Sequence, residues 1–448
     1  MIGPPAALRR HGAVSAGLLA QVLQYGSALA LLPFIVTRLS EAQVALWYIF
    51  VTIQGLVLLA DFGFQPTIGR AIASAYAGAS ELQREGLAQA GEVSGANLPL
   101  VQRIVLTARR LYLALAAAVL LLLATLGTLY VSGLAQGEDF ERIRIAWLLF
   151  ALGTAANLYF LWVVPLLLGS GRVAQSYLFT IVNRGGFALI GIAVLLAGGG
   201  LVALAAANLA GVLIARGAAS AMLRPVFHSL AGITATREEA RTVLLALWPN
   251  TWRLGLVALG AFAINRSNVL IVSSLVSLSA AASYAITLQL FGAVAAVAQL
   301  PTQASLPRMV ARRVQGDIAG LRRMFLPRQA FLLATFVAGA GLLLLLGRPL
   351  LDLVGSTVQL LDPAPMAALA VILLLEANHS NCAIVITTGN RVPFVWPGLA
   401  SGVAVVALAI GVAHHEGGVM GIILAQGLVQ ILYNNWKWPL MLWKELRS

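Results

Sequence analysis

The sequence predicts an all-α membrane protein whose helices cross the bilayer many times. Hydrophobic residues make up 60% of the 448 positions and charged residues only 10%, whereas soluble domains contain about 25% charged residues. The apolar residues form separate blocks, each at least as long as the roughly 20 residues that a helix needs to cross the hydrocarbon core. An integral membrane protein is the class that fits both observations.

Twelve blocks meet this length requirement. They lie at residues 12–36, 44–66, 106–131, 145–168, 176–197, 200–220, 247–272, 281–306, 325–346, 366–388, 393–413 and 419–442. The first block follows Arg9 and Arg10, but it is longer than the apolar core of a secretory signal. We therefore expect it to be retained as the first of about twelve transmembrane helices.

The positive charges indicate the orientation of these spans, because lysine and arginine accumulate in cytoplasmic loops. With a cytoplasmic N-terminus, the external segments contain only four basic residues, Arg38, Arg142, Arg144 and Arg348. We therefore expect both termini to be cytoplasmic, and the net charge of +13 to reflect topology. Nucleic-acid binding is not expected, since these arginines flank apolar helices and face anionic lipid headgroups.

The polar segments divide the chain into two halves. The longest are residues 75–105, 216–241 and 307–327, and the middle one separates six spans from six. This predicts an N-terminal six-helix lobe at 1–222, a cytoplasmic linker at 223–242 and a C-terminal six-helix lobe at 243–448. Six spans per half is the arrangement of parallel repeats. The external loops are short, which argues against a polysaccharide polymerase because that enzyme needs an external domain.

Motifs for enzymatic catalysis, metal binding and nucleotide binding are missing from the sequence. It contains no zinc-protease helix, paired cysteines, Walker motif or nucleophile elbow. Its one cysteine, Cys382, lies within an apolar block and fits a small buried side chain. We therefore expect a transporter that is not an enzyme and needs no cofactor or metal, driven by a gradient or by the free energy of its substrate.

Three arginines inside the spans are the main candidates for substrate binding. Arg184 and Arg266 lie well within the fifth and seventh blocks, and Arg253 lies nearer the cytoplasmic surface. Ionisable groups at this depth are expensive and usually face a bundle interior or a wet cavity. A guanidinium stays charged and forks onto phosphate or carboxylate oxygens. The alternative is that each arginine extends its head to the interface, which is easiest for Arg253.

Amide and aromatic side chains supply the remaining candidate binding residues. Asn265 and Asn268 flank Arg266, and Gln24 and Gln303 lie in the first and eighth blocks. Such amides suit sugar hydroxyls, but they also suit hydrogen bonds between helices. Tyr48 is a candidate for stacking on a sugar ring, or alternatively an anchor at the membrane interface.

Acidic residues inside the spans are scarcer, and they are candidates for ion or proton coupling. Glu376 and His379 are spaced i, i+3 in the tenth block, so they share a helix face. A carboxylate beside an imidazole can bind a proton or a cation. A polar contact between helices is the alternative. Asp61 ends the second block and fits a structural pairing with Arg70 or with a neighbouring helix.

Several segments together resemble the Wzx-type polysaccharide flippases of the multidrug/oligosaccharidyl-lipid/polysaccharide (MOP) exporter superfamily. They are LPFIVTRLS at 32–40, LWY at 46–48, DFGF at 61–64, INRSN at 264–268 and TTGNR at 387–391. The resemblance covers essentially the whole chain. Relatives often carry an acid at the position of Asn268, and this departure leaves Arg266 without that pairing partner.

The resemblance implies a fold of two six-helix lobes in a V shape around a cationic cavity. It implies a flippase of the bacterial inner membrane for O-antigen or exopolysaccharide export, which moves undecaprenyl-pyrophosphate-linked oligosaccharide to the outer leaflet by alternating access. Arg184 and Arg266 best match the family's cationic cavity residues. Membrane lipids, polysaccharide polymerase and export proteins are the further partners that it suggests.

Three alternatives stay open at this point. A cation-coupled multidrug antiporter of the same superfamily would need acidic residues in its cavity, whereas here arginines outnumber acids within the spans. A lipid II flippase would usually have fourteen spans rather than twelve. A membrane polysaccharide polymerase would need the large external loop that this sequence lacks.

Overall fold

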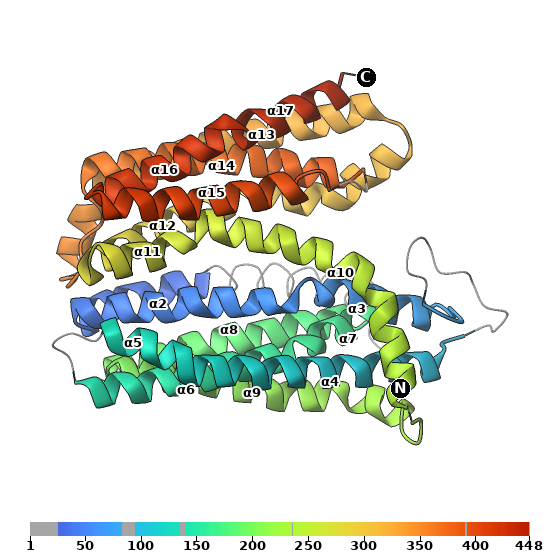
Figure 1. Ribbon diagram of the computed structural model, residues 1–448. Coiled ribbons are helices and arrows are strands. Elements are labelled where there is room, and N and C mark those ends of the chain that lie inside the picture. The colour runs from blue at the N-terminus through green and yellow to red at the C-terminus, as the bar shows by residue number, and fades with distance from the viewer. Residues whose placement is uncertain (1–25, 83–94, 135–138, 235, 390–391, 448) are drawn as a thin grey trace, which may run out of the picture. The chain divides into compact units, whose positions relative to one another are not determined.

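The computed structural model describes residues 26–82, 95–134, 139–234, 236–389 and 392–447 (Figure 1). Within these ranges the chain forms helices joined by short connections, and none of the described residues forms a β-strand. The predicted all-α fold class is therefore confirmed.

Ten of the twelve predicted spans coincide with described helices that could cross a membrane, and the first and last predicted spans contain shorter helices. Nine helices in the described ranges are long and apolar enough to cross a membrane, and the bent pair α10 (Arg237–Asn265) and α11 (Ser267–Leu275) makes a tenth. The first predicted span contains the helix Gly26–Arg38, whose preceding residues lie outside the described part. The last span contains α16 (Gly418–Leu432) and α17 (Asn434–Glu445), which are separated by a break at Tyr433.

The first of two compact units comprises the chain up to Arg38 and Ile53–Ala258. Its large fully buried side chains include Tyr112, Trp147 and Trp162. Helix α8 packs on α9, α6 on α9 and α3 on α7. The helices of this unit include α3 (Phe64–Tyr76), α4 (Leu98–Leu122), α5 (Thr128–Leu134), α6 (Phe140–Tyr159), α7 (Val163–Gly169), α8 (Val173–Leu196) and α9 (Leu201–Ser229).

The second unit comprises Leu39–Thr52 and Leu259–Ser448. Its core includes the stacked rings of Phe291 and Phe336, whose centroids are 6.4 Å apart. Helix α16 runs beside both α14 and α15 (Figure 1). Its helices include α12 (Leu278–Val314), α13 (Ile318–Leu353), α14 (Pro363–Thr387) and α15 (Val395–His414).

Two helices, α2 (Glu41–Leu58) and α10, pass from one unit into the other. Residues 39–52 group with the second unit, and residues 243–258 group with the first. The division into lobes at 1–222 and 243–448 stays a prediction. The linker predicted at 223–242 is mostly helical, since α9 continues to Ser229 and α10 begins at Arg237.

The polar segment predicted at 307–327 is also a helical hairpin rather than an irregular loop. Helices α12 and α13 have 37 and 36 residues, so each is about 55 Å long and extends well beyond a hydrocarbon core of about 30 Å. The turn between them places Gly316 at φ 72°. The Asp317 carboxylate then caps α13 by accepting a hydrogen bond from the Gly320 backbone N–H at 2.7 Å.

A π-helical segment interrupts the third span at Leu123–Gly127. A π-helical turn has backbone hydrogen bonds between residues i and i+5 instead of i and i+4. The Leu123 carbonyl accepts a hydrogen bond from the Trp147 indole N–H at 3.0 Å. Gly127 leaves the space that the Trp147 ring fills, because a Cβ there would lie 2.5 Å from the ring. The sequence predicted this span as a regular helix, and the buried indole explains the departure.

Candidate functional site

Arg184 lies at the centre of the 24-residue helix α8. Its Cα is therefore about 17 Å along the axis from either helix end. Its side chain is exposed, and no carboxylate of the described residues lies within 4.0 Å of its guanidinium. An arginine at this depth needs water, an anion or a polar partner to offset its desolvation.

Arg184 does not lie on the apolar stripe of α8. Leu178, Leu189 and Leu196 are exposed and mark that stripe. At about 100° per residue, Arg184 lies about 120–140° around the helix from these leucines. Arg184 lies instead on nearly the same helix face as Gly191, which is buried. The guanidinium thus extends from the side of α8 that packs against the protein, not from the side suited to lipid tails.

Arg266 lies at the 42° bend between α10 and α11. The predicted seventh span is therefore not one straight helix. Ser267 donates its hydroxyl to the Ala263 carbonyl, and Asn265 donates its amide to the Ala261 carbonyl at 3.1 Å. Polar side chains of this kind compete with the helical hydrogen bonds and favour a bend.

The Arg266 side chain is exposed and has no ionic partner in the part of the chain that the structure describes. No carboxylate within the described ranges is found at 4.0 Å or less from its guanidinium. The two arginines thus share one property, a charged head that is exposed and is not paired with any described acid. Arg184 belongs to the first unit and Arg266 to the second.

The two asparagines beside Arg266 have different surroundings. Asn268 is fully buried, and its amide donates to the Gln426 carbonyl oxygen at 2.8 Å. Asn265 is only partly buried, and its amide also donates to Glu376 Oε1 at 3.0 Å. Asn268 therefore holds α11 against α16, whereas Asn265 ties the bend to the carboxylate on α14.

Glu376 and His379 lie together on α14, as their spacing predicted. His379 Nε2 is 4.0 Å from Glu376 Oε1, and His379 Nδ1 is 2.8 Å from the amide oxygen of Asn435. Because that oxygen accepts, Nδ1 carries a hydrogen, and Nε2 carries one only in the imidazolium form. Glu376 Oε2 is buried and has no hydrogen-bond partner among the described residues. The pair therefore places a buried carboxylate oxygen that has no described partner close to an imidazole ring.

Further amides connect the helices around this pair. Gln329 on α13 donates to Asn378 at 2.6 Å and accepts from Asn381 at 2.7 Å, both on α14. Asn434, just after the break between α16 and α17, donates to Ser401 Oγ at 2.9 Å. Its amide oxygen accepts from the Trp438 indole at 2.9 Å. These amides form contacts between helices, one of the two uses that the sequence left open, although the buried Oδ1 of Asn381 has no partner among the described residues.

Asp61 is buried in the first unit, where it ends the 3-10 turn Leu59–Asp61. The Tyr112 hydroxyl on α4 donates to its carboxylate, and the Gln65 backbone N–H donates at 3.3 Å. Among the described residues Asp61 has no ion pair, so the suggested pairing with Arg70 is not formed. The alternative of a contact with a neighbouring helix is the one observed.

The remaining predicted site residues are scattered. The Tyr48 ring is buried with 5% exposure, and its hydroxyl has no hydrogen-bond partner in the described ranges. Gln303 is partly buried on α12, with no hydrogen bond to any described residue. Gln24 lies outside the described residues, and Arg253 is placed on α10 without its side chain being described.

Sequence reasoning missed two partners of these residues. Tyr112, which binds Asp61, and Gln329, which links α13 to α14, were not singled out because each lies in a block that is otherwise mainly apolar. A glutamine in such a block is itself a signal for a polar contact. Among the described residues, no group of three or more histidine, cysteine or acidic side chains is placed to hold a metal.

Comparison with solved structures of other proteins shows which fold this chain has. One neighbour is an inward-facing multidrug resistance MATE family transporter of the MOP superfamily, with 14% identity over 97% of this chain and 99% of that chain, and a TM-score of 0.68. The chain has the fold of a MATE-family transporter.

Two further structures support this fold assignment. An outward-facing MATE family transporter has a TM-score of 0.59 at 14% identity, over 98% of this chain and 96% of that chain. A MOP superfamily transporter from Pyrococcus furiosus, described by a reverse polarity of its binding pocket that suggests a different function, matches with the same score and coverage at 15% identity. No protein-family model and no curated protein matches the chain.

Proposed function

We propose that this protein is a Wzx-type flippase that moves undecaprenyl-pyrophosphate-linked oligosaccharide from the cytoplasmic to the outer leaflet of a bacterial inner membrane. Arg184 and Arg266 would receive the pyrophosphate as the two units alternate in access. The observation that carries the proposal is that both guanidinium groups are accessible within the spans and are not neutralised by a described carboxylate. Such groups suit an anionic headgroup.

The chemistry of the cargo fits these residues. A pyrophosphate offers several anionic oxygens, and each charge-assisted hydrogen bond to them contributes about 1.5–3 kcal/mol. Sugars could use amides that are not engaged elsewhere, and Gln303 is such a residue within the described ranges. The prenyl tail can stay in lipid, so the protein needs a polar path only for the headgroup.

The proposal is tested by Arg184→Ala and Arg266→Ala. Each should reduce translocation of a defined prenyl-pyrophosphate oligosaccharide in liposomes by at least about tenfold, since one lost charge-assisted contact corresponds to that factor. Lysine at either position should restore transport only in part, because an ammonium cannot make the bidentate fork. Arg224→Ala is the matched control, because Arg224 is exposed near the end of α9 and has no ion pair with a described residue.

A cation-coupled multidrug antiporter is the second candidate, and one observation favours it. The Glu376 and His379 pair, tied to the bend by Asn265, offers a site for a proton or a cation. In that case Glu376→Gln should abolish dye uptake driven by a proton or sodium gradient in vesicles. Gradient-driven dye transport by the wild type, together with normal oligosaccharide translocation in both arginine variants, would overturn the flippase proposal.

A further inference from the structure

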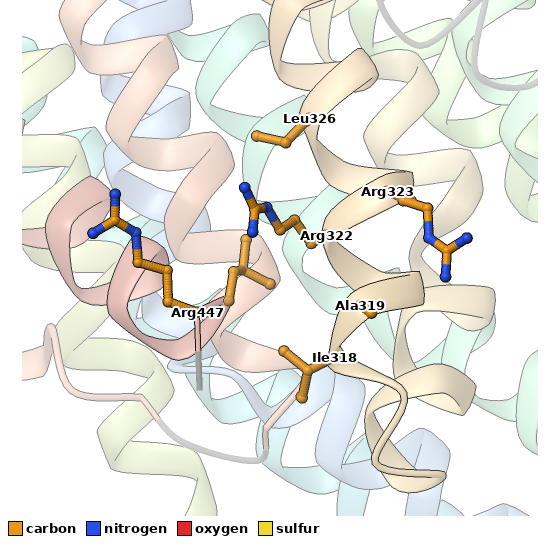
Figure 2. Close-up of a pocket in the computed structure, with 7 residues that line it drawn as sticks. Ile318, Ala319, Arg322, Arg323, Leu326 and Arg447 are labelled. Atoms are coloured by element: carbon orange, nitrogen blue, oxygen red, sulfur yellow. The ribbon is translucent and has the colours of Figure 1, made fainter.

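A separate basic cavity lies in the second unit, where the start of α13 meets the end of α17. Its volume is about 390 Å³, and its lining includes Ile318, Arg322, Leu326, Leu446 and Arg447 (Figure 2). Arg322 extends from α13 into the space between the two helices, whereas Arg323 points away from α17 (Figure 2). The cavity thus combines charged heads with apolar walls from both helices.

The two arginines of this cavity contact one aromatic ring. The guanidinium carbon of Arg322 lies 5.4 Å from the centroid of the Trp443 ring, and that of Arg447 lies 4.8 Å from it. Cation–π contacts hold both heads near the same ring. These two distances place the guanidinium carbons at most about 10 Å apart, where like charges repel, so an anion bound beside both heads would stabilise the arrangement.

The acids of this end of the unit are already paired. Residues 306–328 and 437–447 contain nine basic residues but only Asp317 and Glu445 as acids. Asp317 pairs with Arg312, and Glu445 pairs with Arg313 at 2.9 Å. Arg322 and Arg447 have no carboxylate within 4.0 Å among the described residues. Of the three arginines that line the cavity, Arg323 interacts electrostatically with Asp317, whereas Arg322 and Arg447 have no described acid as a counter-charge.

The surroundings indicate the source of the missing anion. The excess of basic residues assigns this end to the cytoplasmic side by the positive-inside rule, and Trp443 is the kind of residue that sits at headgroup level. The cytoplasmic leaflet carries anionic phospholipids, and basic pockets between helices there bind their headgroups. Leu326 and Leu446 form apolar walls next to the charged heads, which suits the glycerol and the first carbons of an acyl chain.

We infer that this cavity binds the phosphate headgroup of an anionic phospholipid of the cytoplasmic leaflet, with Arg322 and Arg447 as its ligands. The lipid would act as a fixed counter-ion that joins α13 to α17. The site is independent of the arginines assigned to the transported substrate. Its occupant would stay bound while the transporter works.

The test is native mass spectrometry of the purified full-length protein in detergent, titrated with cardiolipin, phosphatidylglycerol or phosphatidylcholine. The double variant Arg322→Gln with Arg447→Gln should weaken binding of the two anionic lipids by at least about tenfold, since it removes two charge-assisted contacts. Binding of phosphatidylcholine should not change.

Two controls keep the inference falsifiable. Arg224→Gln with Arg241→Gln removes the same charge from exposed positions of α9 and α10 that have no ion pair with a described residue, and it should change lipid affinity by less than about twofold. Trp443→Phe keeps an aromatic face and should retain binding. Equal losses in the two double variants would overturn the proposed site. So would full displacement of the lipid by millimolar inorganic pyrophosphate, because the occupant would then be a soluble anion.

Discussion

The close contact between α10 and α15 should make Gly260 intolerant of even one added methyl group. A Cβ at Gly260 would lie 2.7 Å from the backbone carbon of Gly398 and 2.8 Å from its oxygen. Ordinary carbon contacts need about 3.5 Å or more, so the two backbones would have to separate by several tenths of an ångström. Such overpacking costs about 1–3 kcal/mol, and it exceeds the roughly 0.5–1 kcal/mol that alanine gains over glycine within a helix.

The matched control is Gly341→Ala on α13, where an added Cβ meets no atom within 4 Å. That variant gains helix propensity without a clash, so it should be as stable as the wild type or more stable. The assay is thermal unfolding in detergent, followed by the loss of monodisperse protein in size-exclusion chromatography. Gly260→Ala should unfold at a lower temperature than the wild type, and Gly341→Ala should not.

Gly260 lies on α10, six residues before Arg266 at the bend that follows this helix, so the same contact positions the bend. We therefore expect Gly260→Ala to reduce transport as well as stability. A Gly260→Ala protein with the stability of Gly341→Ala would refute the reasoning, because it would mean that α10 and α15 do not approach each other closely.

Two further predictions concern the other acids. Tyr112→Phe removes the hydroxyl that donates to buried Asp61 and should destabilise the protein by about 1–3 kcal/mol in denaturation assays. The control Tyr159→Phe removes a hydroxyl without a described partner and should have little effect. Equal stabilities of the two variants would contradict this prediction. The Gly320 N–H and then Arg312 hold the pKa of Asp317 below its usual 3.8, so its stabilisation exists above that pH and is lost as the pH falls through the lower folded-state pKa. Asp317→Ala should therefore be less heat-stable than the wild type at pH 7, with the difference shrinking in acid, and a constant difference at all pH values would argue against the cap.

The sequence motifs resemble one particular family, the Wzx-type flippases, whereas the solved structures show only the fold of the chain. The motifs at 61–64 and 264–268 indicated a MOP-type transporter, and the solved MATE transporters have that fold across nearly the whole chain. A shared fold does not select the cargo, because function depends on the site grafted on the fold. The flippase assignment therefore depends on the chemistry of Arg184 and Arg266.

The sequence by itself determined the class of protein and the places of its apolar helices. Long apolar blocks have few stable alternatives in a bilayer, because every backbone N–H and C=O must be bonded within the segment. For this reason the helices were predictable from composition and length. The i, i+3 pairing of Glu376 and His379 was also predictable, since it is local to one helix.

Only the tertiary structure decided which polar residues are engaged and which are accessible. Asn268 and Gln303 are both amides in apolar blocks, yet the first is bonded to Gln426 on another helix and the second has no described partner. The bend at Arg266 and the partnership of Asp61 with Tyr112 likewise depend on contacts between distant segments. Helical periodicity fixes the face on which a side chain lies, but the neighbouring helix decides what that face meets.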